Sequence, residues 1–395
     1  MVCRGEEWAR VPCDKPLQTP YNSSSMSAHT VSILPPPDPM LVATTLRTRL
    51  DFSSELTSMV SLAGDASNRR YFRLHLKSGM TSSLILMQLA DPEGFKASEE
   101  AVSGSPREVT ELPFVNVLRT LAKAGVSVPA LHYYDDVAGL LYLQDLGDIT
   151  LFQACEEGGE SAIRQLYPQA IDALAQIHLR VQADAADDCV AFSRSFDVPL
   201  LMWEFDHFLE YGIGARHNKP MSANHEKVVR EIFAMIAESI ARQPTVFTHR
   251  DYHSRNLMID GDRLGVIDFQ DALMGPVTYD LASLLRDSYL ALDERFIDEM
   301  IDRYLEGMCA ELGRETQERM LLTDRVAFRR LFDWTSIQRN LKAAGRFVYI
   351  DRVKGNPKFL VDVPRTLGYV RRNLEAYPEL EPLHMALASY VPEWQ

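Results

Sequence analysis

The sequence predicts an α+β fold with a bilobal arrangement: a small β-rich N-lobe followed by a larger, mostly helical C-lobe. Two observations lead to this prediction. Short apolar runs with strand-like alternation, separated by turn residues, fill much of residues 61–147. Apolar residues at helical spacing then dominate from about residue 150 onwards. We therefore expect a β-rich N-lobe over residues 41–147 and a helical C-lobe over residues 148–395.

The expected N-lobe begins with a short helical pattern at residues 41–58. A strand, a Gly-Asp turn and a second strand follow over residues 61–76. Residues 91–111 are polar and contain Gly and Pro, so they predict a loop. The remaining expected elements are a third strand, one helix and two further strands: 82–90, 113–124, 131–136 and 139–147.

The expected C-lobe consists of helices and one β-hairpin. The hairpin covers residues 256–268, where apolar runs flank an Asp-Gly-Asp turn signal. A buried helix is expected to open within GPVTYDLASLLRD at residues 275–287. Helical periodicity predicts the other helices at 165–181, 198–211, 224–241, 294–312 and 316–345.

Residues 1–40 differ from the rest of the chain. They contain YNSSSMSAHT and ILPPPDPM, which are rich in Ser and Pro and lack periodicity. Such composition predicts a disordered tail. An incorrectly assigned start is the alternative, with initiation at Met26 or Met40.

Composition narrows the function. The net charge of −14 disfavours a nucleic-acid or anionic-membrane binder, because these carry basic surfaces. The five cysteines are scattered, without metal or disulfide spacing, which favours a reducing, cytoplasmic compartment. The sequence shows neither an apolar run long enough to span a membrane nor a recognisable signal peptide. It carries no clear oligomer signal, and we expect a monomer.

The most specific motif is THRDYHSRNLMIDGDRLGVIDFQD at residues 248–271. It follows the pattern H-R-D-x-x-x-x-N, with an I-D-F sequence further on, that is typical of kinase catalytic loops. Asp251 is the candidate catalytic residue, because a carboxylate can orient an acceptor hydroxyl and take its proton. Asn256 and Asp268 are the candidate Mg²⁺ ligands, since water and ATP phosphates complete the coordination of this ion.

The expected ATP phosphate loop precedes this motif. Gly64 and the small residues after it allow backbone N–H groups to approach phosphate, and nearby arginines add positive charge. We expect the cofactor contacts at Gly64, Asp65, Ala66, Ser67, Asn68, Arg69 and Arg70, with Arg73 as a further cation. Residues 144–147, including Gln144 and Leu146, are expected to meet the adenine. Met87 occupies the place where protein kinases carry a phosphate-binding Lys, so the arginines are expected to substitute for it.

Other residues of the motif are expected to support the loop. His249 and Arg250 are predicted to brace it, with a neutral His249 bonded to the backbone. Asp280, which follows Thr278 and Tyr279, is predicted to anchor it by hydrogen bonds.

With these residues in place, the chain resembles the aminoglycoside phosphotransferase/choline kinase superfamily. That resemblance implies a protein-kinase-like bilobal fold, with an N-lobe that binds the nucleotide and a C-lobe that carries the catalytic loop and the sugar site. HRDYHSRN carries the resemblance, together with IDFQDALMGPVTYDLASLL after it. Four strings look more specifically like the bacterial anomeric sugar kinases of cell-wall recycling: GDASNRRYFR, LYLQDLGD, FQDALMGPVTYDLASLLRD and DWTSIQRNLKAAGRF. That resemblance implies ATP-dependent phosphorylation of the C1 hydroxyl of N-acetylmuramate, N-acetylglucosamine or both, in peptidoglycan recycling.

The sugar pocket is expected in the helical lobe near Asp251. Its candidate residues are Trp203, Glu204, Arg255, Asp271 and Arg339. A basic group on the helix that carries Arg339 and Lys342 is expected to meet the lactyl carboxylate of N-acetylmuramate. Two alternatives stay open: an aminoglycoside or choline-type small-molecule kinase, and a catalytically inactive pseudokinase that serves as a binding scaffold. Retention of Asp251, Asn256 and Asp268 argues against the second alternative.

Overall fold

The computed structural model describes residues 35–50, 55–62, 69–77, 81–89, 111–181, 189–218, 220–261 and 263–395. Residues 38–395 form one unit by their contacts. The predicted division into lobes at residue 147 therefore stays a prediction. Nearly all of the expected tail lies outside the described residues, and so do the phosphate-loop residues 64–68.

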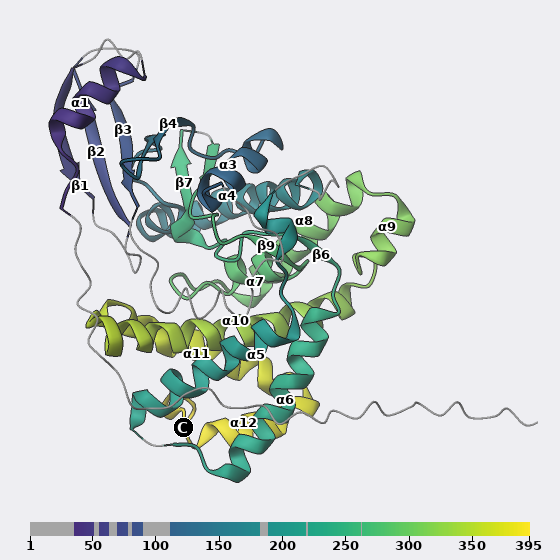
Figure 1. The fold of residues 1–395 in the computed structure, drawn as a ribbon. Coiled ribbons are helices and arrows are strands. Elements are labelled where there is room, and N and C mark those ends of the chain that lie inside the picture. Colours follow the sequence, from purple (N-terminus) through teal and green to yellow (C-terminus); the bar gives the residue numbers. More distant parts are fainter. Residues whose placement is uncertain are drawn as a thin grey trace, which may run out of the picture. The chain divides into compact units, whose positions relative to one another are not determined.

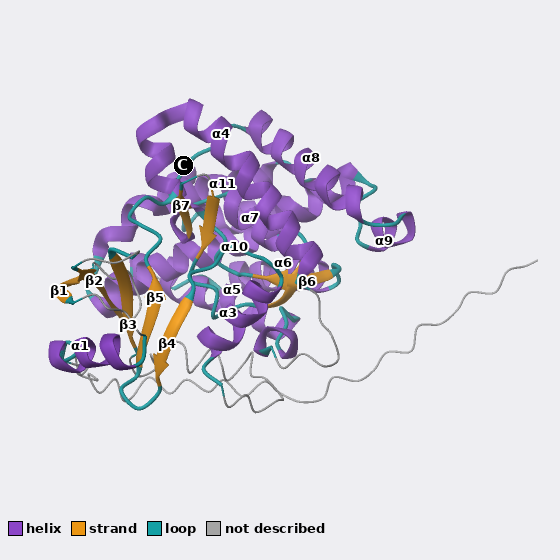
Figure 2. Cartoon of the chain, turned by 90° about the horizontal axis from the view of Figure 1, so that it is seen from above, coloured by secondary structure: helices purple, strands orange, loops and turns teal. Residues whose placement is uncertain are grey.

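A five-stranded antiparallel sheet occupies the N-terminal part of this unit, in the order β1-β2-β3-β5-β4 (Figure 2). Its register aligns Tyr71, Met87 and Leu141 across the three central strands. The strands are β1 (Leu56–Ser61), β2 (Arg70–Leu76), β3 (Ser83–Gln88), β4 (Leu131–Asp135) and β5 (Leu140–Gln144). The predicted strands that correspond to β2, β3, β4 and β5 are confirmed, with shifted ends. The first strand was predicted to begin at residue 61, whereas β1 ends at Ser61.

Two helices cover this sheet because successive strand residues point to opposite faces. Helix α1 (Pro39–Thr48) packs Val42 and Leu46 against a cluster that includes Phe72 and Tyr142. Helix α3 (Pro113–Lys123) packs against the cluster that contains Met87, Leu141 and Leu143. The prediction of helix throughout 41–58 was wrong at its C-terminal end, since α1 stops at Thr48 and β1 begins at Leu56.

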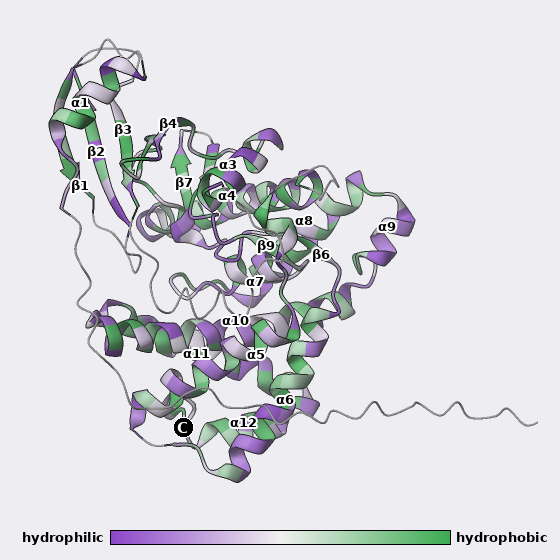
Figure 3. Cartoon of the chain, viewed as in Figure 1, coloured by the Kyte–Doolittle hydropathy of each residue, from purple (hydrophilic) through white to green (hydrophobic). Residues whose placement is uncertain are grey.

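The remainder is mostly helical, and α10 and α11 lie side by side in it (Figure 1). The longer helices show polar and apolar residues along their length, as helices with one buried face do (Figure 3). The helices are α4 (Leu151–Arg180), α5 (Val198–His207), the π-helix η2 (Phe208–Ala215), α6 (Ala223–Ala241), α7 (Tyr279–Leu285), α8 (Glu294–Glu311), α9 (Arg314–Arg319), α10 (Arg325–Lys354), α11 (Val363–Glu375) and α12 (Glu381–Ala388). Short 3₁₀ helices lie at η1 (Val190–Ser193), η3 (Ser254–Asn256), η4 (Pro357–Asp362), η5 (Pro378–Leu380) and η6 (Pro392–Trp394).

Three helix predictions in this part needed correction. The predicted helix 165–181 is the second part of α4, which begins at Leu151 and has non-helical backbone at Gly159. The predicted helix 316–345 is two helices, α9 and α10, separated by a break at which Leu321 adopts a left-handed φ of 60°. Asp324 caps α10 by accepting hydrogen bonds from the Val326 and Ala327 amides. The predicted helix 198–211 continues beyond α5 as a π-helix.

Two small β-ribbons carry the motif region. The predicted hairpin is confirmed as β7 (Leu257–Asp260) and β8 (Arg263–Val266). A second pair, β6 (Thr245–Thr248) and β9 (Leu273–Pro276), was not predicted. The loop from residue 249 to 256 connects β6 to β7, and is therefore held between the two ribbons. Within the described residues, no helix is long and apolar enough to cross a membrane.

Candidate active site

Asp280, at the start of α7, fixes the backbone of the catalytic loop. This fully buried carboxylate accepts hydrogen bonds from the His249 amide at 2.6 Å and from the Arg250 amide at 2.9 Å. The predicted anchoring role of Asp280 is confirmed. Such charge-assisted bonds hold the loop in a fixed position without help from a ligand.

Asp287 is a second anchor, which the sequence analysis missed. Its carboxylate accepts hydrogen bonds from both the amide and the hydroxyl of Ser254. It also accepts a hydrogen bond from the Tyr289 amide at 2.9 Å. The position of Asp287 was visible in the string LASLLRD, but the contact with Ser254 joins residues 33 positions apart. Periodicity along one helix cannot reveal such a pair.

His249 braces the loop from within. Its Nε2 lies 2.9 Å from the Ile267 carbonyl, and its Nδ1 lies 3.3 Å from the Asp251 amide. A neutral ring that donates from Nε2 and accepts at Nδ1 satisfies both contacts. The predicted bracing by His249 therefore agrees with the geometry. The ring ties Asp251 to the segment that leads into Asp268.

Two residues of the site have unusual backbones. Arg250 and Asp268 adopt positive φ angles of 82° and 63°. Non-glycine residues in this region are strained, and such strain is concentrated at functional sites. The hydrogen bonds of Asp280 offset it at Arg250.

Asp251 is a half-buried carboxylate close to several cationic side chains. Burial raises its pKa, but Lys342, His253, Arg250 and Arg339 together outweigh burial and lower the pKa well below its usual range. Asp251 is therefore ionised at neutral pH and can accept a proton or a hydrogen bond.

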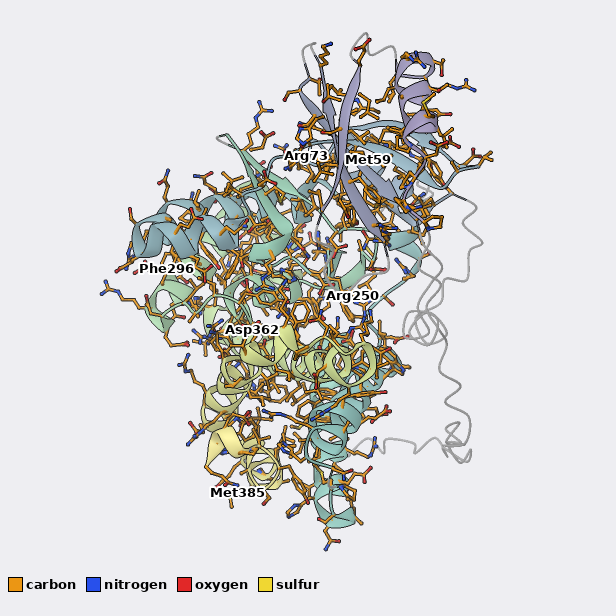
Figure 4. All side chains as sticks on the ribbon, turned by 90° about the vertical axis from the view of Figure 1, so that its left-hand side faces the viewer. Met59, Arg73, Arg250, Phe296, Asp362 and Met385 are labelled. Atoms are coloured by element: carbon orange, nitrogen blue, oxygen red, sulfur yellow. The ribbon has the colours of Figure 1, made fainter. Side chains whose placement is uncertain are left out.

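Glu204 connects this loop to α5 and α10. Its carboxylate accepts hydrogen bonds from Arg250 Nη2 at 2.8 Å and Gln338 Nε2 at 2.7 Å, and Lys342 Nζ lies 3.1 Å away. Burial raises the pKa of Glu204, but Lys342 and Arg250 reverse the shift and lower it. Arg250 is buried, and in the view of Figure 4 it is labelled below Arg73 of β2. With 1% of its surface exposed, Glu204 is placed to position Arg250 and Lys342 rather than to touch a sugar directly.

Asn256 and Asp268 lie at adjacent ends of the β7–β8 hairpin. The Ile267 amide donates to the Asn256 carbonyl at 3.1 Å, which brings the two residues together. Asn256 Nδ2 donates to the Asp251 carbonyl at 2.9 Å, which leaves Oδ1 as the free acceptor of this side chain. The Asp268 side chain is 45% exposed. One amide oxygen and one accessible carboxylate fit a Mg²⁺ ion that keeps water and phosphate ligands.

This arrangement differs from a metal site built from protein side chains alone. Among the described residues, no group of three or more His, Cys, Asp or Glu side chains is suited to hold a metal ion. A kinase site with two protein ligands would not form such a group.

Arg69, one of the arginines expected to bind ATP, lies close to Asp268, a candidate metal ligand. Its Nη1 lies 3.9 Å from Asp268 Oδ1. Burial, and then the Asp268 carboxylate, raise the pKa of the neighbouring Tyr71 to about 12. Arg70 instead lies over the Phe72 ring, 5.1 Å from its centre. Arg69 is thus the arginine of this group that approaches the catalytic centre.

Arg73 has a different position from the one predicted. Its guanidinium pairs with Asp145 at 2.7 Å and with Asp148 at 2.7 Å. It therefore joins β2 to the segment after β5 and is not available as a phosphate cation. Met87, at the position of the kinase Lys, is fully buried.

Gln144 is the last residue of β5, and Leu146 lies in the segment that follows. The Gln144 amide donates to the Ala130 carbonyl at 2.8 Å, and its side-chain Oε1 accepts from the Ala130 amide at 3.2 Å. Leu146 packs so closely on Gly265 that a Cβ there would lie 2.6 Å from Leu146 Cδ1. This contact joins the segment after β5 to the β7–β8 hairpin, which carries the candidate metal ligands at its ends.

The other predicted sugar residues occupy varied surroundings. Trp203 stacks with His207 at a ring distance of 6.0 Å. The Arg255 guanidinium lies over the Tyr289 ring at 3.7 Å and the Phe152 ring at 4.9 Å. Asp271 accepts a hydrogen bond from Gln270 Nε2, which also donates to Asp268. Arg339 is close enough to Asp251 to contribute to its lowered pKa.

The fold and this site define a kinase-like phosphotransferase. Residues 58–318 match the model of the phosphotransferase enzyme family, and the chain belongs to that family. It is a phosphotransferase, as the catalytic loop predicted.

Relatives narrow the comparison. A protein of Neisseria meningitidis serogroup B named N-acetylmuramate/N-acetylglucosamine kinase is 31% identical over 330 residues, covering 83% of this chain and 89% of its own length. A protein of Pseudomonas aeruginosa with the same name is 32% identical over 332 residues, covering 84% and 88%.

Solved structures agree on the fold. A choline kinase from Cryptosporidium parvum matches 88% of this chain and 99% of its own, with a TM-score of 0.58 and 12% identity. An ADP-bound aminoglycoside phosphotransferase matches 84% and 98%, with a TM-score of 0.52 and 13% identity. The predicted kinase-like α+β fold is confirmed.

Proposed function

We propose that this protein is an ATP- and Mg²⁺-dependent kinase that phosphorylates the anomeric C1 hydroxyl of N-acetylmuramate, N-acetylglucosamine or both. Two relatives named N-acetylmuramate/N-acetylglucosamine kinase, which are 31% and 32% identical over 330 and 332 residues, support this acceptor class. The observation that carries the chemistry is the ionised Asp251 beside the oxygen pair of Asn256 and Asp268. The setting is peptidoglycan recycling in the cytoplasm, and the protein acts as a monomer.

In this proposal Asp251 accepts a hydrogen bond from the acceptor hydroxyl, orients it and takes its proton as the phosphoryl group is transferred. An anomeric hydroxyl is more acidic than an ordinary alcohol, so a carboxylate with a lowered pKa suits it. Bound Mg²⁺ neutralises charge on the phosphates, and Asn256 Oδ1 and the Asp268 carboxylate would hold it. Lys342 and Arg250, held by Glu204, keep Asp251 ionised.

The nucleotide contacts remain proposals. We assign Arg69 to the phosphates because it reaches Asp268 at 3.9 Å. Gly64, Asp65, Ala66, Ser67, Asn68 and Arg70 are proposed with it, and Gln144 and Leu146 are proposed near the adenine. Trp203, Arg255, Asp271 and Arg339 are proposed around the sugar, with Glu204 acting through Lys342 and Arg250.

An aminoglycoside or choline-type acceptor is the second candidate, since the structural matches include enzymes of both kinds. Cations near Asp251 argue against it. Lys342, Arg250 and Arg339 all contribute to lowering the Asp251 pKa. A polycationic or quaternary ammonium acceptor would be repelled by these groups.

A coupled assay of ADP release tests the proposal against a panel of acceptors: N-acetylmuramate, N-acetylglucosamine, choline and kanamycin. We expect sugar-dependent turnover that requires Mg²⁺. Turnover with choline or kanamycin alone would favour the second candidate. No turnover with any acceptor, despite measurable ATP binding, would favour a scaffold role.

A further inference from the structure

Arg339 on α10 is a buried guanidinium whose hydrogen-bonding capacity is largely unused. It keeps 5% of its surface exposed. Its Nε donates to the Ser283 hydroxyl at 2.7 Å, whereas the buried Nη1 has no hydrogen-bond partner. A guanidinium has five N–H donors in a planar fork. The Arg339 guanidinium is therefore held in place through Nε and has unpaired N–H groups at Nη1.

Other buried arginines of the chain differ from Arg339. Arg250 pairs with Glu204 at 2.8 Å, and Arg286 pairs with Glu294 at 2.5 Å. Within the described part of the chain, no carboxylate oxygen lies within ion-pair distance of Arg339. Leaving a buried charge without a partner is strongly unfavourable. The unpaired N–H groups at Nη1 of Arg339 are therefore suited to bind an anionic group of a ligand.

Lys342, the other cation expected to meet the substrate acid, is already engaged. It lies one turn further along the same face of α10, and its Nζ is 3.1 Å from Glu204. Arg339 is consequently the better-placed cation for an added anion.

The position of Arg339 relative to Asp251 fits an acid on the acceptor. Arg339 is near enough to Asp251 to help lower its pKa, but it lies outside ion-pair distance. In N-acetylmuramate the lactyl ether is on C3, two ring carbons from the reacting C1. A sugar whose C1 hydroxyl meets Asp251 therefore carries its carboxylate on a nearby part of the ring, and Arg339 is a cation close enough to Asp251 to influence its pKa.

We propose that Arg339 binds the carboxylate of an acid-bearing acceptor, so that this chain prefers N-acetylmuramate to N-acetylglucosamine. The inference rests on the proposed function and deepens it. A guanidinium binds a carboxylate in a planar, charge-assisted arrangement, which Lys cannot reproduce. N-acetylglucosamine has no such acid and leaves Arg339 unpaired.

The test compares kcat/KM for the two sugars in wild type and Arg339→Gln. We expect the loss with N-acetylmuramate to exceed the loss with N-acetylglucosamine by about ten- to hundred-fold, the value of one charge-assisted bond. Arg352→Gln is the matched control, because Arg352 lies on α10 but is 53% exposed and pairs with Asp351. Equal losses with both sugars would overturn the inference and assign Arg339 to the phosphoryl group instead.

A second arm leaves the protein unchanged. Wild type is assayed with N-acetylmuramate and with its lactyl carboxamide, which is nearly isosteric but neutral. We expect KM for the carboxamide to be at least about ten-fold higher. Equal KM values, or a wild-type preference for N-acetylglucosamine, would overturn the inference even if Arg339→Gln fails to fold. Failure of the wild type to phosphorylate any of these sugars would instead refute the proposed function.

Discussion

Asp251 is the residue on which the chemistry depends. It is ionised because Lys342, His253, Arg250 and Arg339 outweigh the cost of its burial. Asp251→Asn keeps the shape of the side chain but cannot take a proton. We expect kcat to fall by about 10²–10⁴-fold. ATP binding, measured by calorimetry, should persist, and Asp260→Asn at the exposed end of β7 should leave turnover near wild type.

Lys342 tunes the charge state of Asp251. Because it lowers the Asp251 pKa, Lys342→Met should raise that pKa toward its ordinary range. A carboxylate base is lost as pH falls through its pKa, so the acidic limb of kcat/KM should move to higher pH in the variant. Profiles that extend below the ordinary carboxylate pKa of 3.8 measure this shift. Lys227→Met, on the exposed face of α6, is the control, and an unshifted limb in Lys342→Met would contradict the assigned role.

At the residue scale, local spacing was enough to predict Asp251, Asn256 and Asp268 as one group, and the hairpin brings them together. It also predicted Asp280 as an anchor. The sequence placed Glu204 in the sugar site but could not reveal its contacts with Arg250 and Lys342, because these partners lie 46 and 138 positions away in sequence. Arg73 was predicted to be a phosphate-binding cation, because its actual partner Asp145 is remote in sequence and could not be foreseen.

At the element scale, α10 and η2 approach each other closely at Gly345. A Cβ on Gly345 would lie 2.8 Å from Phe208 Cα and 3.3 Å from the His207 carbonyl. Gly345→Ala should therefore lower the free energy of unfolding by about 1–3 kcal/mol. Gly368→Ala in α11 meets nothing within 4 Å and should stabilise by up to about 1 kcal/mol through helix propensity. Thermal unfolding of both variants checks this contrast, and equal behaviour would contradict the packing.

Glu294, at the start of α8, joins three arginines from different elements: Arg286, Arg329 and Arg372. Burial raises its pKa, but Arg286 and the other two cations lower it to about 2. A depressed carboxylate pKa stabilises the fold above its ordinary value of 4.5, and this stabilisation is lost as pH falls toward 2.

Glu294→Gln should accordingly destabilise at pH 7, by about 1–2 kcal/mol after allowance for its partial exposure. The difference from wild type should shrink at pH 3. Urea unfolding at both pH values measures it. Glu160→Gln, which removes an exposed pair with Arg164, should cost less than about 0.5 kcal/mol at either pH. A Glu294→Gln effect independent of pH would count against the network.

Element prediction succeeded where periodicity was long and uniform. Helices α6 and α8 match their predicted ranges within one residue at each end. It failed where a local signal decides the boundary, as at the capped start of α10 by Asp324. The β6–β9 pair joins segments almost thirty positions apart, and no pattern within either segment announces the pairing.

At the scale of the whole molecule, the site combines contributions from distant parts of the chain. Arg69 at the start of β2 reaches Asp268, and Glu204 of α5 and Lys342 of α10 surround the catalytic loop. The chain carries a net charge of −14, yet cations dominate around Asp251. This local reversal of charge is the feature that favours an anionic acceptor over a polycation.

The position of the phosphate in the product tests the central claim most directly. The protein is incubated with ATP, Mg²⁺ and N-acetylmuramate or N-acetylglucosamine, and the product is examined by ³¹P and ¹H NMR. The account predicts a phosphorus nucleus coupled to the anomeric proton, and no such product with Asp251→Asn. Phosphate on another hydroxyl, or an anomeric phosphate that still forms at the wild-type rate with Asp251→Asn, would contradict it.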